Sequence, residues 1–261
     1  MSTVATAANS GVGAAHFDYL LQLADTSLIL GQRFGELVGH APALEEDLGL
    51  ANVSLDLVGQ ARLILSYAGE LEGRGRTEDQ LAFLREEHEY RNLVLAEQPN
   101  GDFGQVIVRQ LLIDAYQLEL YELLQHSTDT RLAAIAAKSL KETRYHFRFS
   151  GNWLIRLGDG TEESHARAQQ AIDRLWPYTR ELFDEQESDQ SLARLGIAPP
   201  LTAVEQSWST RVNGVLREAT LERPAATPYR WFGRRGTHSE HLGYILADMQ
   251  YLQRTYPGAE W

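Results

Sequence analysis

Four carboxylates in the sequence have the residue types and spacing that could bind a pair of metal ions. Asp25 and Asp56 lie equally far from the first predicted helix turn, which is centred between His40 and Ala41. Asp114 and Glu142 lie equally far from the second, which is centred on Thr128. Residues equidistant from the turn of an antiparallel helix pair lie at one level, because both helices rise about 1.5 Å per residue. Each pair would therefore hold two carboxylates halfway along its helices, as carboxylate-bridged di-metal bundles do.

Most of the histidines that such a metal pair needs are missing. In di-metal bundles a histidine follows the acid by three residues on two of the helices. Gly59 and Tyr145 occupy those positions here, and Gln60 and His146 follow one residue later. We therefore expect a degenerate di-iron site and no metal or other cofactor in this chain. Unrelated core or surface acids and a working metal centre are the alternatives. The degenerate positions are Asp25, Asp56, Gln60, Asp114, Glu142 and His146.

A second group of candidate residues lies near the C-terminus. Residues 229–236 concentrate aromatic and basic side chains in an acidic chain, and such side chains are enriched at protein interfaces. His238 and His241 have a spacing found in metal sites, although the start of a helix explains it as well. A plain surface loop and a phosphate site for an acyl-CoA are the alternatives for the loop. The predicted interface residues are Arg230, Trp231, Phe232, Arg234, Arg235, His238 and His241.

The composition excludes several classes of function. The 261 residues include no cysteine, which rules out disulfides, thiolate zinc sites, iron–sulfur clusters and a cysteine nucleophile. A formal charge of −12 argues against nucleic acid as a partner. The first fifteen residues lack the basic start and apolar stretch of a signal peptide, and no run approaches the roughly 20 apolar residues of a membrane span. We expect a cytoplasmic protein with no membrane partner.

The spacing of apolar residues is helical almost throughout and predicts an all-α fold. Residues 1–15 are expected to form a disordered tail, and residues 16–261 a single domain. Its core, about 17–157, is predicted to be a ferritin-like four-helix bundle made of two antiparallel helix pairs joined by a long crossover. Additional C-terminal helices are expected within about 161–256. The long helices are expected at about 18–38, 42–71, 102–126, 130–157, 162–186, 203–221 and 238–255.

Local signals also predict where helices begin and which faces they bury. Three capping boxes are expected, formed by Thr77 with Gln80, Thr202 with Glu205, and Thr237 with Glu240. A shorter helix should follow the first of them, to about residue 91. The core face of the second helix is expected at Leu44, Leu48, Ala51, Leu55, Val58, Arg62 and Leu65.

Several stretches, taken together, resemble one known family. They are residues 35–36, 39–42, 48–52, 55–62, 97–101, 141–146, 238–243 and 249–254. This set is similar to the PaaC-type structural subunits of bacterial phenylacetyl-CoA epoxidases, which are ring-1,2 monooxygenases. The resemblance extends from about Phe17 to Trp261.

The resemblance implies a role in a multicomponent enzyme. In that family a related catalytic subunit, also ferritin-like, holds the di-iron centre and binds phenylacetyl-CoA, and a reductase supplies electrons. The structural subunit pairs with the catalytic one and supports it during aerobic phenylacetate degradation. The resemblance thus implies a non-catalytic structural subunit whose partner is the homologous catalytic subunit, with self-association also possible, and it transfers no catalytic residue. A carboxylate-rich di-metal oxidase or oxygenase, active in its own right, is the alternative.

Overall fold

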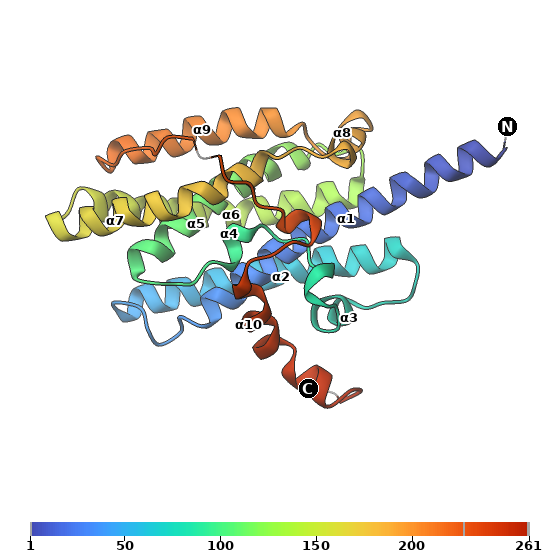
Figure 1. Ribbon diagram of the computed structural model, residues 1–261, viewed down its shortest axis with the longest axis horizontal. Helices are drawn as coiled ribbons and strands as arrows, with labels where there is room; N and C mark the ends of the chain where they lie inside the picture. Colours follow the sequence, from blue (N-terminus) through green and yellow to red (C-terminus); the bar gives the residue numbers. More distant parts are fainter. Residues whose placement is uncertain (1, 227, 260–261) are drawn as a thin grey trace. The chain divides into compact units, whose positions relative to one another are not determined.

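A computed structural model describes residues 2–226 and 228–259, with side chains from Val12 onward. Every regular element in these residues is helical, which confirms the all-α prediction, and the β-bridge between Phe232 and Thr237 is isolated. The helices are α1 (Ser2–Gly35), α2 (Leu44–Glu72), α3 (Glu78–Phe83), η1 (Glu87–Glu89), α4 (Val94–Glu97), α5 (Phe103–Leu124), α6 (Thr130–Gly158), α7 (Glu162–Leu175), η2 (Trp176–Phe183), α8 (Glu187–Arg194), α9 (Leu201–Glu218), η3 (Gly233–Arg235), α10 (Glu240–Met249) and α11 (Tyr251–Thr255) (Figure 1).

The chain forms two compact units, each built around one long helix pair. Unit 1 comprises Met1–Pro99, Glu187–Leu192 and Phe232–Trp261, and contains the pair α1 and α2. Unit 2 comprises Asn100–Gln186 and Ala193–Trp231, and contains the pair α5 and α6. Two antiparallel helix pairs are consistent with the predicted ferritin-like fold.

In unit 1, α1 and α2 approach each other closely at Gly31. Ser54 Oγ donates a hydrogen bond to Gly31 O at 2.8 Å, and a Cβ atom at Gly31 would lie 3.1 Å from Val58 Cγ2. A glycine in a helix usually lowers stability relative to alanine, and close packing here offsets that cost. Helix α1 begins at Ser2, inside the segment for which the sequence predicts disorder, and that prediction stays a prediction.

The buried face of α2 differs from the expected one. The helix buries Leu50, Val53, Leu57 and Ile64 against its neighbours, whereas Leu44, Leu48 and Leu55 of the expected core face are exposed. Leu65 of that face is buried, as predicted. The prediction was wrong because α2 carries two apolar stripes at helical spacing. Periodicity shows that a stripe exists, but it does not show which stripe faces a neighbouring helix.

By length and composition alone, α2 could cross a membrane. Its most apolar 18-residue window has a mean hydropathy of 1.3, and 44% of that window is buried. Core helices share this composition, so a single such helix is weak evidence for a membrane span. The expectation of no membrane partner remains a prediction.

The segment between the two helix pairs begins as expected and then departs from the prediction. Gln80 N donates to Thr77 Oγ1 at 3.3 Å and Thr77 N donates to Gln80 Oε1 at 3.0 Å, which confirms this capping box. The helix ends at Phe83, and the short helices η1 and α4 follow instead of one helix to residue 91.

In unit 2, α5 is buried along most of its length and packs against α6, α7 and α9. Trp208 of α9 donates its indole N–H to Leu112 O of α5 at 3.0 Å and packs on Trp176 and Phe183. The helix expected at 162–186 ends as α7 at Leu175, because Pro177 has no N–H to continue it, and η2 follows.

Two expected helix starts were wrong, and some short helices were not predicted. Pro200 precedes α9 with no side-chain cap, so Thr202 and Glu205 form no capping box there. Ser239, not Thr237, caps α10, and its hydroxyl accepts from His241 N at 3.4 Å. Thr237 is unsuited to this role because its backbone pairs with Phe232. The unpredicted helices include α4, α8 and η3.

Candidate functional site

In unit 2 the predicted acid pair is out of register. Ser150 Oγ donates to Asp114 Oδ2 at 2.7 Å, so these two short side chains lie directly across from each other. Glu142 lies eight residues earlier on α6, about 12 Å along the helix axis. Asp114 and Glu142 therefore do not lie at one level, and that prediction was wrong. Residues that face each other across α5 and α6, such as Asp114 and Ser150, are equally far from position 132 and not from position 128.

The predicted acid pair of unit 1 is also out of register. The contact between Ser54 and Gly31 places Asp56 more than one helical turn from the level of Asp25. Asp25 is fully buried, whereas Asp56 is half-buried. The two carboxylates thus occupy different environments and do not form a pair.

Asp25 is instead held in a buried ion pair with Arg85, whose side chain is 2% exposed. Arg85 Nη1 donates to Asp25 Oδ2 at 2.9 Å, and Nη2 donates to Oδ1. The backbone N–H of Arg91 also donates to Oδ2, at 2.9 Å. Bidentate contacts of this kind are among the strongest in proteins. Burial lowers the pKa of Arg85, but the adjacent Asp25 carboxylate more than offsets this, so the pKa lies above its usual value.

The remaining donors of Arg85 also have partners. Its Nε donates to Leu81 O, and its Nη1 donates to Glu89 O at 3.0 Å. Its guanidinium carbon lies 4.3 Å from the ring centroid of Tyr90. A metal ion at Asp25 would therefore have to displace a guanidinium that is bound on several sides.

Asp114 is a fully buried acid whose pKa lies well above its usual value. Burial raises its pKa well above the usual value, and hydrogen bonds from Ser150 and Gln110 lower it only in part. Gln110 Nε2 faces Asp114 Oδ1, and Gln110 Oε1 is buried with no hydrogen-bond partner among the described residues. The two ends of an amide have nearly the same shape, so rotating Gln110 would let Oε1 accept the Asp114 proton.

Replacing Asp114 by asparagine is expected to remove a pH-dependent loss of stability. The folded state keeps a proton on Asp114 that the unfolded chain releases above about pH 4. The free energy of unfolding of the wild type should therefore decrease as the pH rises from about 4 to the raised pKa of the folded state. The decrease is about 1.4 kcal/mol for each pH unit. Urea unfolding between pH 4 and 8 should show that the free energy of unfolding of Asp114→Asn, relative to that of wild type, increases as the pH rises.

The matched control for this measurement is the exposed acid Asp173. Asp173→Asn should shift stability by a small amount that does not change with pH, because its carboxylate is solvated in both states. A difference between Asp114→Asn and wild type that stays constant across this pH range would contradict a protonated Asp114.

The other predicted metal positions do not complete a ligand set. Gln60 and His146 are buried, and Glu142 is half-buried. Tyr145 is 40% exposed, and a Cβ atom at Gly59 would meet nothing within 4 Å. Within residues 2–226 and 228–259, no group of three or more histidine, aspartate or glutamate side chains is placed to hold a metal ion. The residues present therefore do not fit a di-iron pair, and the degenerate-site assignment remains a prediction.

Sequence reasoning missed a polar cluster around Glu97 in unit 1. The Glu97 side chain is fully buried, and its Oε1 accepts from Asn92 Nδ2 at 2.9 Å. Its Oε2 accepts from Ser239 N at 2.9 Å and from Ser239 Oγ at 2.6 Å. On the backbone, Arg33 donates to Glu97 O through Nε at 2.9 Å and Nη2 at 2.6 Å. These bonds connect α1, α4 and the start of α10.

His238 completes this cluster through both of its ring nitrogens. Its Nδ1 lies 2.6 Å from Glu97 Oε1, and its Nε2 lies 3.0 Å from Tyr90 O. A carboxylate and a backbone carbonyl only accept hydrogen bonds, so both ring nitrogens must donate. With Glu97 ionised, His238 is therefore an imidazolium, and this charge is a prediction that is tested below.

Arg234, predicted at an interface, is also buried and paired within unit 1. Its Nη2 donates to Asp189 at 2.8 and 2.9 Å, and its Nε and Nη2 donate to Gln22 Oε1 at 3.0 and 2.8 Å. Arg234 and His238 thus have internal partners. Arg230 and Arg235 are exposed, as residues of the predicted interface must be.

The remaining predicted interface residues are half-buried. Trp231 stacks on Tyr178 with ring centroids 4.6 Å apart. The Arg235 guanidinium lies 5.2 Å from the ring centroid of Phe232. His241 is half-buried at the start of α10. Their part in an interface remains a prediction.

Comparison with known proteins gives two matches that cover nearly the whole chain. Residues 3–261 match the family described as "Phenylacetic acid catabolic protein". A relative from Escherichia coli (strain K12), the C subunit of 1,2-phenylacetyl-CoA epoxidase, is 53% identical over 243 residues. The match covers 93% of this chain and 98% of that relative.

Proposed function

The chain belongs to the phenylacetic acid catabolic protein family, as its resemblance predicts, and from this premise we propose that it is a structural subunit of a 1,2-phenylacetyl-CoA epoxidase. In this proposal the chain has no catalytic centre of its own. It pairs with a related di-iron catalytic subunit in the cytoplasm and supports it during aerobic phenylacetate degradation. The di-iron centre and the binding of phenylacetyl-CoA belong to that partner.

The ion pair between Asp25 and Arg85 carries the non-catalytic assignment. A carboxylate that bridges metal ions must direct its lone pairs toward the metals, whereas both oxygens of Asp25 face guanidinium donors. Arg85 thus supplies a permanent cation at a position where a di-metal bundle would bind one. In unit 2, Asp114 is likewise satisfied by Ser150 and Gln110. Both helix pairs can therefore be stable without a metal.

Metal analysis of the separated subunits of the co-purified complex tests this proposal. We expect iron to accompany the catalytic subunit and no stoichiometric iron to remain with this chain after anaerobic loading with ferrous iron. Two tightly bound irons per copy of this chain, or oxygenase turnover by this chain alone, would favour the carboxylate-rich di-metal oxidase instead. Failure to co-purify with the catalytic subunit would overturn the structural role.

A further inference from the structure

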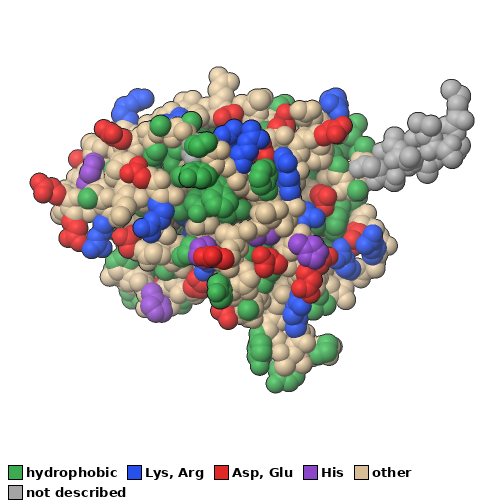
Figure 2. Space-filling model, in the orientation of Figure 1, with side chains coloured by type: hydrophobic (Ala, Val, Ile, Leu, Met, Phe, Trp, Pro, Cys, Tyr) green, Lys and Arg blue, Asp and Glu red, His purple; other side chains and the backbone are tan. Residues whose placement is uncertain are grey.

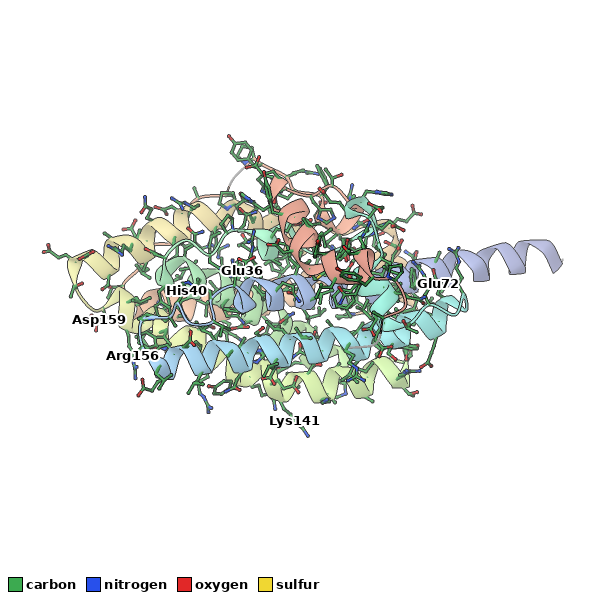
Figure 3. All side chains as sticks on the ribbon, turned by 90° about the horizontal axis from the view of Figure 1, so that it is seen from below. Glu36, His40, Glu72, Lys141, Arg156 and Asp159 are labelled. Carbon is green, nitrogen blue, oxygen red and sulfur yellow. The ribbon has the colours of Figure 1, made fainter. Side chains whose placement is uncertain are left out.

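Helix α6 carries a row of basic side chains on the face that points to solvent. The chain contains only two lysines, and both lie on this helix together with four arginines. All six residues are exposed, and they fall within about 140° of the helix circumference, because successive residues turn by about 100°. Figure 3 shows Lys141 of this row pointing away from the ribbon. We call the row the α6 stripe, which consists of Arg131, Lys138, Lys141, Arg144, Arg148 and Arg156.

The positive charge of the α6 stripe is offset only in part by its surroundings. The one acid within α6 is Glu142, which is half-buried. From α5, Glu122 accepts a hydrogen bond from Arg144 Nη2 at 3.2 Å, and Asp159 follows the C-terminal end of α6. Over the face shown in Figure 2, by contrast, acidic and basic side chains are interspersed. A chain with a formal charge of −12 thus has a local excess of positive charge on one helix face.

This arrangement of charges lowers the stability of α6 itself. Like charges that are three or four residues apart lie next to each other on a helix surface and repel. Arg131 lies in the first turn, where the helix dipole disfavours a positive charge. Arg156 lies in the last turn and is favoured there, so the dipole accounts for one residue of the six. An acidic surface bound to the stripe would offset the repulsion. The residues with such spacings are Lys138, Lys141, Arg144 and Arg148.

The composition of the α6 stripe favours a protein as the acidic partner. Arginine and tyrosine are enriched at protein interfaces, and the Arg148 guanidinium carbon lies 5.7 Å from the ring centroid of Tyr145. Helices that bind membranes present large apolar side chains beside their basic residues. In α6, all of which the structure describes, Tyr145 is the one large hydrophobic residue that is exposed, by 40%. A membrane or a nucleic acid is also an extended anion, which would meet the acids of the surrounding surface.

The α6 stripe suits a complex that forms and dissociates. Permanent subunit interfaces are large and hydrophobic, whereas weak redox complexes bury little area. Complementary surface charge contributes more to the rate of association of two proteins than to their affinity. A charged stripe with little exposed apolar area therefore fits a partner that binds briefly.

A monooxygenase reaction needs a partner of this kind. In each turnover one O2 molecule takes up two electrons and two protons, one of its oxygen atoms enters the substrate, and the other leaves as water. Side chains cannot supply these electrons repeatedly, so a separate electron donor has to bind and leave during each cycle.

We propose that the α6 stripe docks an acidic face of the protein that delivers electrons to the epoxidase, in a complex that forms and dissociates in each cycle. This inference rests on the proposed function and adds a second partner to the catalytic subunit. The stripe attracts and orients the electron-donating protein through its charge. The acceptor of the electrons remains the catalytic subunit.

Steady-state turnover of the co-purified complex, measured while the concentration of the electron-donating protein is varied, tests the stripe. Lys141→Glu is expected to raise the KM for that protein about fivefold at low ionic strength and to leave kcat unchanged, because steering acts on association. Arg148→Glu should act in the same direction, and the two effects should multiply because the residues lie about two helical turns apart. In about 1 M salt, where the Debye length is about 3 Å, both variants should match wild type.

Arg74→Glu provides the matched control for this measurement. It changes the net charge by the same amount at a side chain that is 76% exposed in the loop after α2, and it should leave the KM unchanged. The isolated Lys141→Glu chain should keep or slightly raise the unfolding midpoint of wild type, since the new carboxylate lies three residues from both Lys138 and Arg144. A higher KM without a lower midpoint therefore separates docking from folding.

The outcomes separate this inference from the proposed function. If Lys141→Glu keeps the KM of wild type at low ionic strength, the stripe is not the docking surface, although the structural role stands. If Lys141→Glu instead releases the catalytic subunit, the stripe belongs to the permanent interface, which overturns the inference. Loss of binding only to a short DNA duplex, or only to phosphatidylcholine–phosphatidylserine vesicles, would overturn it in favour of an extended anion. If wild type itself does not co-purify with the catalytic subunit, the proposed function fails.

Discussion

Replacing Arg85 by methionine is expected to lower the free energy of unfolding by about 3–5 kcal/mol, because it leaves the Asp25 carboxylate buried without its cation. The loss should be large because Asp25 is fully buried and accepts two of its three hydrogen bonds from Arg85. The carbonyl groups of Leu81 and Glu89 lose a donor in the same variant. Urea unfolding followed by circular dichroism measures the change.

The ion pair between Arg62 and Glu78 provides the control. Arg62 Nε lies 3.5 Å from Glu78 Oε1, and the Arg62 side chain is 76% exposed. Solvent screens such pairs, so Arg62→Met should change the free energy of unfolding by no more than about 1 kcal/mol. An Arg85→Met effect as small as that of Arg62→Met would contradict a buried, structurally important ion pair.

A double variant separates the loss of the pair from the burial of an unpaired charge. Asp25→Leu combined with Arg85→Met removes both charges and replaces them with apolar side chains. It should be more stable than Arg85→Met alone, because removing both partners of a buried pair costs less than removing one. If the double variant is the less stable of the two, most of the loss comes from the shape of the Arg85 side chain and not from charge.

The helices could be predicted from the sequence because their signals are local. Apolar periodicity located both long helix pairs, and Thr77 with Gln80 marked a true helix start. The register within a pair could not be predicted, because distant residues determine the geometry of the turn. Between α5 and α6, Ser127 Oγ donates to Ile197 O at 2.7 Å, and Thr128 Oγ1 donates to Leu195 O at 3.0 Å. Symmetry about Thr128 therefore gave the wrong level for Asp114.

The candidate site could be predicted only in part, for the same physical reason. Asp25 and Asp114 were correctly selected as acids at inward-facing positions, and both are fully buried. Their partners were missed, because Arg85 lies 60 residues from Asp25 and Ser150 lies 36 residues from Asp114. Glu97 offered a usable signal, since it is the single charged residue that ends an apolar run at 93–96. A lone acid in such a run is expected to have a buried partner.

The second large effect is expected at His238, which faces the buried Glu97 carboxylate. His238→Leu should lower the free energy of unfolding by about 3–5 kcal/mol, because the variant removes the charge partner of a carboxyl group that is fully buried. His238→Gln should lose less, since its amide can still donate to Glu97 but carries no charge. His88→Leu is the control, and it should change stability by about 0.5 kcal/mol or less because His88 is exposed.

The charge of His238 can be tested apart from its contribution to stability. Both ring nitrogens face oxygen atoms, Glu97 Oε1 at 2.6 Å and Tyr90 O at 3.0 Å, so each carries a proton when Glu97 is ionised. Nitrogen-15 NMR of the imidazole at neutral pH should show two protonated ring nitrogens. A single protonated nitrogen would mean that Glu97 holds the shared proton, and His238→Leu would then lose much less stability.

Loss of His238 should also weaken the attachment of α10 before it unfolds the rest of unit 1. Ser239 caps α10 and donates twice to Glu97, so the start of this helix depends on the carboxylate that His238 neutralises. The other end of the cluster is anchored independently, because Arg33 donates to the Glu97 carbonyl and not to its carboxylate. Hydrogen exchange in His238→Leu should therefore accelerate at the amides of α10 while those of α1 stay protected. Equal acceleration in both helices would show that the cluster stabilises unit 1 as a whole and not the attachment of α10.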